Sequence, residues 1–219
     1  MARRLRTQPR KLPTQERARA TVATLLTATE RLLSRKGYEA LTTNAIAAEA
    51  GVSIGSVYQY FPTKEAIVAA VVDRFCARRI DDLTRSMATI SPTATLREVI
   101  RGVVSATVAA HLENPALVRV LLQEVPRKGQ LERVDAILDH GIGIVAAALA
   151  ARAEEVRPRN TELAARLLAT ATRGMLLHEI VRDPDWVRDS PDFVDEVTEI
   201  LARYLDPSPP PSRAPRAAF

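Results

Sequence analysis

Apolar residues recur every three or four positions along most of the chain, which is the spacing of one face of an α-helix. The first such stripe predicts a helix over residues 14–36, and its members are Val22, Leu25, Leu26, Thr29, Leu32 and Leu33. A second stripe begins after Thr63 and continues toward Arg85, with Ile67, Val68, Val71, Val72 and Phe75 on one face. The beginning of the chain is therefore predicted to contain two long helices.

The chain beyond Ser91 is predicted to form further helices, and no strand-like alternation competes with them. Their start signals are a capping box at Thr95 and Glu98, Asn114 before Pro115, Asn160, and Ser190 with Pro191 and Asp192. The last three helices are expected over residues 130–156, 161–181 and 191–205. Gly141 and Gly143 lie inside the first of these, where we favour close packing over a kink or room for a ligand. The whole pattern predicts an all-α chain of about nine helices.

Residues 42–64 form two short helical segments joined at a glycine. Thr42 or Thr43 can cap the first segment, whose inner face carries Ile46, Ala47 and Ala50. Gly51 can end that segment in the left-handed conformation, and Ser53 can cap the second. Two helices joined by a turn that contains glycine are typical of a helix-turn-helix.

Composition limits the class of protein. The chain has 219 residues, of which 47% are hydrophobic and only 4% aromatic, so aliphatic residues must fill its core. No apolar stretch reaches the roughly eighteen residues of a membrane span, and the basic start lacks the apolar core of a signal peptide, which predicts a cytoplasmic protein. The single cysteine, Cys76, is interpreted as a buried structural thiol, with a redox sensor as the alternative. We expect neither a metal nor a cofactor.

Positive charge is concentrated near the helix-turn-helix. Residues 1–64 contain eleven Lys/Arg and four Asp/Glu, net +7, whereas the rest contains 20 and 22, net −2. Residues 1–13 are predicted to be a flexible basic arm that reaches DNA, although a solvated tail is an equal alternative. We expect a DNA-binding domain over residues 14–65, a helical domain over 66–205 and a disordered Pro-rich tail over 206–219.

A competing motif occupies the same segment. Residues 51–55, GVSIG, fit the G-x-S-x-G nucleophile elbow of serine hydrolases. That elbow needs a β-strand before the serine, whereas the preceding AIAAEA is rich in helix formers. Three scattered histidines give no convincing catalytic set, so an enzyme is a remote alternative.

The segment GYEALTTNAIAAEAGVSIGSVYQYFPTKEAIV resembles the DNA-binding region of the TetR family of one-component transcriptional regulators. The matching positions are Gly37, Thr43, Ile46, Ala47, Ala50, Gly51, Val52, Ser53, Tyr58, Phe61, Lys64 and Glu65. The resemblance covers about the first third of the chain, and the remainder is similar only in helical character and length.

This resemblance implies DNA contacts at Thr43, Asn44, Ser53, Ile54, Gly55, Ser56, Tyr58, Tyr60 and Lys64, and side-chain chemistry adds Gln59. By side-chain chemistry, the donors Thr43, Ser53, Tyr58, Tyr60 and Lys64 suit phosphate oxygens. Base contacts are then left to Asn44, Ile54, Gly55, Ser56 and Gln59. The second helix contains no arginine, so strong bidentate reading of guanine is not expected.

The resemblance also implies a homodimer on double-stranded DNA and a small-molecule effector in the C-terminal domain. Dimer contacts are expected at Leu163, Leu167, Ala171, Phe193, Val197, Ile200, Leu201 and Tyr204, unless these stripes only close the core of one chain. Candidate ligand contacts are His111, Glu113, Glu124, His140, Met175, His178 and Trp186. A repressor released by a largely apolar ligand is the main hypothesis. A regulator that lacks such an effector, as an activator or under the control of a protein, is the alternative.

Overall fold

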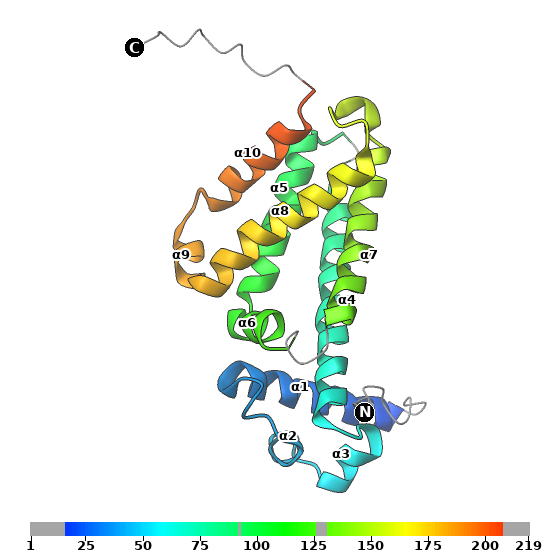
Figure 1. Ribbon diagram of the computed structural model, residues 1–219, viewed down its shortest axis with the longest axis vertical. Helices are drawn as coiled ribbons and strands as arrows, with labels where there is room; N and C mark the ends of the chain where they lie inside the picture. The colour runs from blue at the N-terminus through cyan, green and yellow to red at the C-terminus, as the bar shows by residue number, and fades with distance from the viewer. Residues whose placement is uncertain (1–15, 92, 126–130, 208–219) are drawn as a thin grey trace, which may run out of the picture.

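The computed structural model describes residues 16–91, 93–125 and 131–207, and for residues 131–138 and 140 it describes the backbone alone. Within these ranges the chain is all-α, as the sequence predicts (Figure 1). The predicted basic arm, residues 1–13, lies outside the described residues, and so does most of the predicted Pro-rich tail. None of the described helices is both long and apolar enough to cross a membrane.

Three helices form one end of the molecule, which we call the head: α1 (Glu16–Lys36), α2 (Thr43–Ala50) and α3 (Ile54–Tyr60). Helix α4 (Lys64–Thr89) leaves the head and runs along the rest of the molecule, which we call the body. The body adds α5 (Leu96–Leu112), α6 (Pro115–Gln123), α7 (Leu131–Ala150), η2 (Ala153–Glu155), α8 (Thr161–Arg182), α9 (Pro184–Asp189) and α10 (Phe193–Leu205).

Side-chain caps fix where most of these helices begin. Thr95 and Glu98 form the expected capping box on α5, in which each side chain bonds to a backbone amide of the other. Asn114 accepts a hydrogen bond from the amide of Leu117, and Asn160 caps α8 in the same way. The predicted starts of α5, α6 and α8 are therefore confirmed.

The described residues contain ten α-helices, in agreement with the expected total of about nine. The helix that the sequence did not predict is the short α9, whose N-cap Asp183 accepts a hydrogen bond from the amide of Trp186. Two bounds of the expected helices were wrong. Helix α7 stops at Ala150 and a 3₁₀ turn follows, so the predicted helix to residue 156 is too long. The last helix begins at Phe193, and Asp192 gives it no side-chain cap.

Gly141 and Gly143 in α7 do not serve close packing. A Cβ added at Gly141 or Gly143 would meet nothing within 4 Å. The interpretation of close packing at these two positions is therefore wrong, and Gly141 instead borders open space inside the body.

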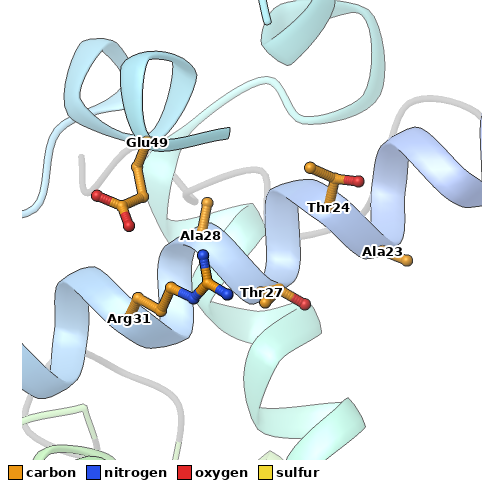
Figure 2. A pocket seen from close by; sticks show the side chains of 6 residues that line it. All are labelled: Ala23, Thr24, Thr27, Ala28, Arg31 and Glu49. Carbon is orange, nitrogen blue, oxygen red and sulfur yellow. The ribbon is translucent and has the colours of Figure 1, made fainter. Parts of the chain in front are cut away.

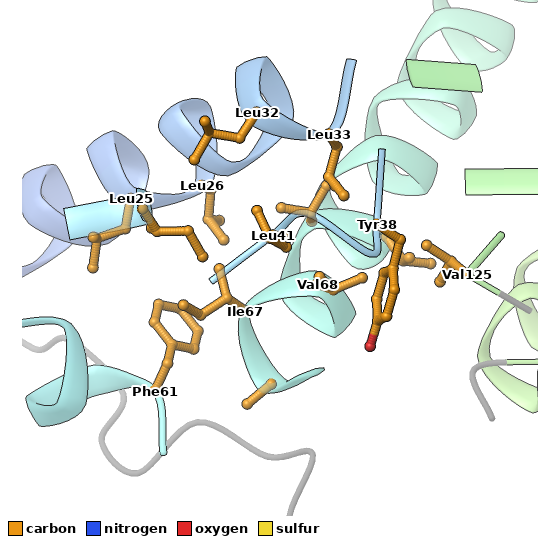
Figure 3. Close-up of a cluster of buried hydrophobic side chains, with 14 of the residues drawn as sticks. Leu25, Leu26, Leu32, Leu33, Tyr38, Leu41, Phe61, Ile67, Val68 and Val125 are labelled. Carbon is orange, nitrogen blue, oxygen red and sulfur yellow. The ribbon is translucent and has the colours of Figure 1, made fainter. Parts of the chain in front are cut away.

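Two hydrophobic clusters hold the molecule together. The first is formed by α1, α2, α3 and the start of α4. It also includes Leu117, Val120 and Leu121 of α6, and Val125 just after that helix. Figure 3 shows Val125 beside Tyr38 at the edge of this cluster. The second lies in the body between α5, α7, α8 and α10. Because α4 and α6 both reach the first cluster, the body is anchored to the head at two places.

Candidate nucleic-acid interface and ligand cavity

The turn between α2 and α3 is fixed by two caps and one glycine. The side chain of Thr42 accepts a hydrogen bond from the amide of Ala45 at 3.1 Å. Gly51 ends α2 with φ 67°, a left-handed conformation that other residues adopt only with strain. Ser53 then accepts from the amide of Ser56 at 3.1 Å and starts α3. Residues 43–60 thus form a helix-turn-helix, as their pattern predicts.

This geometry rules out the nucleophile elbow. The residues before Ser53 form α2 and a glycine turn instead of a β-strand. The hydroxyl of Ser53 caps a helix and also lies 2.9 Å from that of Ser56. The serine hydrolase alternative is therefore wrong for this segment.

One surface of the helix-turn-helix carries most of the residues expected to contact DNA. Asn44, Ile54, Gly55, Tyr58 and Gln59 are all exposed. The hydroxyl groups of Tyr58 and Thr43 lie 3.2 Å apart, which links the start of α2 to the face of α3. Hydroxyl and amide groups are thus exposed together on this surface, where they can meet a DNA groove and its phosphates.

Two of the expected contacts lie elsewhere. Tyr60 is only 9% exposed, because it follows Val57 by three positions and shares its inward face. Lys64 donates from Nζ to the carbonyl of Leu41 at 3.2 Å, and its ammonium lies 4.8 Å from the ring centroid of Tyr38. Neither residue is displayed as a free phosphate donor.

The head also has a shallow hollow between α1 and α2, with a volume of about 300 Å³. Figure 2 shows its lining, which consists of Ala23, Thr24, Thr27, Ala28, Arg31 and Glu49. Small and polar side chains give it little apolar surface to hold an organic molecule. The better candidate for a ligand site lies in the body.

The body contains a larger cavity of about 480 Å³ between α4, α5, α7 and α8. Its walls are mainly aliphatic, with representative residues Leu83, Ile100, Val103, Val145 and Leu149. Cavities of this size, with apolar walls and few polar groups, are typical of small-molecule sites.

Few titratable groups face this cavity, and burial holds two of them neutral. Burial lowers the pKa of His111, whose Nδ1 lies 2.7 Å from the carbonyl oxygen of Thr107. Burial also raises the pKa of the Cys76 thiol to about 11, which keeps it protonated and unreactive near pH 7. This supports a structural thiol over a redox sensor.

Comparison with known proteins identifies both parts of the molecule. Residues 25–71 match the family described as "Bacterial regulatory proteins, tetR family". Residues 95–205, about half of the chain, match "Tetracyclin repressor-like, C-terminal domain". The chain belongs to the TetR family.

Relatives of this TetR-family chain include regulators and a nucleoid protein. The nucleoid occlusion factor SlmA of Pasteurella multocida is 33% identical over 114 residues, 52% of this chain and 54% of that protein. The HTH-type transcriptional repressor KstR of Rhodococcus jostii is 28% identical over 117 residues, again 52% of this chain and 54% of that protein. The chain thus spans about half the length of the curated relatives it matches.

Solved structures share the whole TetR-family fold. The fatty acid degradation regulator FadR from Bacillus halodurans has a TM-score of 0.69 at 17% identity, covering 88% of this chain and 96% of that one. NalD, the secondary repressor of the MexAB-OprM multidrug efflux pump in Pseudomonas aeruginosa, has a TM-score of 0.65 at 22% identity, covering 87% and 98%. At these identities the likeness shows the fold alone.

The residues proposed from sequence as ligand contacts do not converge in the TetR-family body. His111 lines the cavity, whereas Met175 packs against the second hydrophobic cluster and does not. His178 and Trp186 are exposed on the surface. The side chain of His140 lies outside the described residues.

The two glutamates also lie apart from the cavity lining. Glu124 accepts a hydrogen bond from the amide of Tyr38 at 2.8 Å, and so it joins α6 to the head. Glu113 lies at the end of α5, with its carboxylate 3.8 Å from Arg79. Sequence reasoning missed the cavity residues Arg79 and Arg173, although Arg173 follows Ala169 by one helical turn on the lining face of α8.

The residues proposed as dimer contacts divide into three groups by exposure. Leu163, Leu167 and Ile200 are 52%, 49% and 55% exposed, and Ala171 on α8 is exposed as well. Phe193 and Tyr204 are half-buried: Phe193 packs edge-on against Trp186, and Tyr204 lies under the guanidinium of Arg157. Val197 and Leu201 are buried in the second cluster and cannot contact a partner, because α10 turns this face toward α5 and α8 of its own chain.

Proposed function

We propose that this TetR-family chain is a transcriptional repressor that binds an inverted-repeat operator as a homodimer and is released by a small, largely apolar ligand. One observation carries the proposal, and it concerns α4. Most residues from Ala66 to Val72 are buried in the head cluster, while Phe75, Leu83 and Met87 further along the same helix line the body cavity. A ligand that shifts α4 therefore also shifts the support of α3.

Polar contacts add a second connection between body and head. Arg74 on α4 pairs with Glu30 on α1, with 2.9 Å between Nη2 and Oε2. Asn114 donates to the hydroxyl of Ser34 at 3.0 Å, and Glu124 accepts from the amide of Tyr38. Movement of α5 or α6 around the cavity thus reaches α1 directly.

Small energies are enough for such a switch. A ligand shifts the equilibrium between two spacings of the heads only by its differential affinity for them. Tenfold release from DNA needs about 1.4 kcal/mol, which is a small part of the free energy of filling an apolar cavity.

A gel shift at low salt tests the DNA-binding part of the proposal. Sites are first selected from fragmented genomic DNA, and we expect an inverted repeat whose half-sites lie roughly 34 Å apart. Gln59→Glu places a negative charge on the exposed face of α3 and should abolish the shift because the phosphates repel it. Gln123→Glu makes the same change on the exposed surface of α6 and should leave the shift intact.

The outcomes separate the proposal from its alternatives. Absence of any selected site at low salt would overturn DNA binding as the function. Release of the shifted complex by apolar compounds supports the effector role of the cavity. A stable complex that no compound releases would favour a regulator without small-molecule effector, a possibility suggested by the name of the 33%-identical relative, a nucleoid occlusion factor.

A further inference from the structure

One arginine stands out among the aliphatic walls of the body cavity. Arg173 lies on α8 between Ala169 and Leu177, four residues from each, and all three line the cavity. Residues four apart on a helix share one face, so the partly buried side chain of Arg173 belongs to the wall of the cavity.

The other charged groups of the lining already have partners. Arg79 pairs with Asp82 at 3.0 Å between Nη2 and Oδ2, and it donates to the carbonyl of Ala110. Arg152 donates to the carbonyl of Ala94 at 3.0 Å and lies 3.5 Å from Glu155. Among the residues that the structure describes, no carboxylate or carbonyl bonds to the guanidinium of Arg173. Among the charged residues of the described lining, Arg173 is therefore the one without an ion-pair partner.

Cys76 indicates where along the cavity the guanidinium of Arg173 lies. Burial raises the pKa of the Cys76 thiol and the nearby carboxylate of Asp73 raises it further, whereas Arg173 and Arg79 are near enough to oppose that rise. Cys76 and Phe75 line the end of the cavity nearest the head. From Phe75 the lining continues along α4 to Met87, twelve residues and roughly 18 Å further at the rise of an α-helix. The cavity thus pairs a cation at one end with a long aliphatic wall.

We infer that the ligand of this cavity is an anionic amphiphile with an aliphatic body and a carboxylate headgroup, and that Arg173 binds the headgroup. The inference deepens the proposed function, since it names the class of effector. A guanidinium matches a carboxylate with two parallel hydrogen bonds. Leaving a cation unpaired in a partly apolar site costs free energy, which an incoming anion recovers. Arg79, which also lines the cavity, adds a further donor, because its Nε is buried without a hydrogen-bond partner.

Isothermal titration of the full chain with dodecanoate and with dodecanol tests the inference without DNA. Both probes have the same alkyl chain, and only dodecanoate carries a charge. We expect dodecanoate to bind at least tenfold more tightly than dodecanol. Arg173→Gln should weaken dodecanoate binding at least tenfold and leave dodecanol binding unchanged. Arg182→Gln, which removes an exposed arginine from the same helix, should change neither.

A further variant checks that both probes enter this cavity. Ala148 lines its wall, so Ala148→Phe should fill part of the space and weaken both probes, with thermal melting confirming that the variant is folded. Equal affinity of the wild type for both probes, or unchanged dodecanoate binding in Arg173→Gln, would overturn the inference. That failure would leave DNA binding untouched, whereas dodecanoate binding by a chain that selects no DNA site would refute the proposed function alone.

Discussion

Tyr58 is the residue through which the two helices of the DNA-binding surface meet. Its exposed hydroxyl lies 3.2 Å from that of Thr43, so both groups can donate to neighbouring phosphate oxygens. Tyr58→Phe removes one donor and keeps the ring. We expect operator affinity to fall about 3- to 10-fold, the value of one hydrogen bond, for every operator sequence alike. Fluorescence anisotropy on the selected site and on single-base variants measures this.

Gln59→Ala provides the contrast to that substitution. The side-chain amide of Gln59 is exposed on α3, as Tyr58 is, and is suited to an adenine edge. Loss of this amide should therefore reduce discrimination between bases more than overall affinity. A loss of specificity in Tyr58→Phe with uniform weakening in Gln59→Ala would reverse the roles assigned here.

His111 gives the body a dependence on pH. Its pKa is lowered mainly by burial, and Arg79 adds to the effect while the carbonyl of Thr107, Asp82 and Glu113 oppose it. A histidine with a lowered folded pKa binds its proton more readily in the unfolded chain, so stability falls as the pH drops below about 6.5. We expect the melting temperature to decrease between pH 7.5 and 5.5, and less steeply in His111→Gln. His178→Gln, which removes an exposed histidine, should retain the wild-type slope.

Residue chemistry could be predicted from sequence better than residue placement. Thr43 and Tyr58, expected as phosphate donors, do lie side by side, but Tyr60 proved to be buried and Lys64 engaged with Leu41. For Tyr60 the reason is that a seven-residue helix has too few apolar positions to define its inner face from sequence. For Lys64, the first residue of α4, the bond to Leu41 joins residues 23 apart in the chain, and no local pattern predicts it. The cavity residue Arg173 was missed because its significance depends on a space that several helices enclose.

At the scale of elements, the helix-turn-helix depends on the left-handed turn at Gly51. A Cβ at this position meets no neighbour, so backbone strain alone sets the effect of a substitution. Gly51→Ala should destabilise the head by about 1–2 kcal/mol, the cost of a left-handed residue with a side chain. Chemical denaturation measures the difference in unfolding free energy.

Gly55→Ala is the matched control for that change. Gly55 lies in helix α3 without a positive φ, and an added Cβ would approach only Ser53 Oγ, at 3.8 Å. Alanine should therefore stabilise this helix by up to about 1 kcal/mol. Equal destabilisation by both substitutions would show that the turn conformation is not what Gly51 provides.

The starts of α5, α6 and α8 were predicted most accurately. Thr95, Asn114 and Asn160 all start helices where expected, because a cap is a local contact that the sequence contains in full. Helix α9 was missed, since six residues are too short for a periodic stripe. The end of α7 was misplaced because no glycine or proline lies at Ala150 to mark it.

At the scale of the whole molecule, the position of α6 in the chain does not predict which domain it packs against. This helix follows α5 in sequence, but its residues Leu117, Val120 and Leu121 are buried in the cluster of the head. A periodic stripe predicts that a helix has an apolar inner face, but it does not predict which other helices that face packs against. The same ambiguity explains Val197 and Leu201, which were expected at a dimer contact and instead close the core of their own chain.

The remaining exposed stripe predicts how two copies associate. Leu163, Leu167 and Ala171 follow one another at intervals of four on α8, and Ile200 on α10 is similarly exposed. Such clustered apolar side chains on one face are typical of a helix-packing interface between subunits. Leu167→Glu should therefore convert a dimer into a monomer at micromolar concentration, because pairing across a two-fold axis would bury two carboxylates together.

Sedimentation velocity measures that conversion, and Gln123→Glu serves as the control because it adds the same charge on α6. Operator binding should change together with the oligomeric state, since one head contacts one half-site and a dimer gains affinity by linking two. The Leu167→Glu monomer should lose its preference for an inverted repeat over a single half-site. A variant that remains dimeric, or a wild-type chain that sediments as a monomer, would show that the exposed face of α8 has another partner.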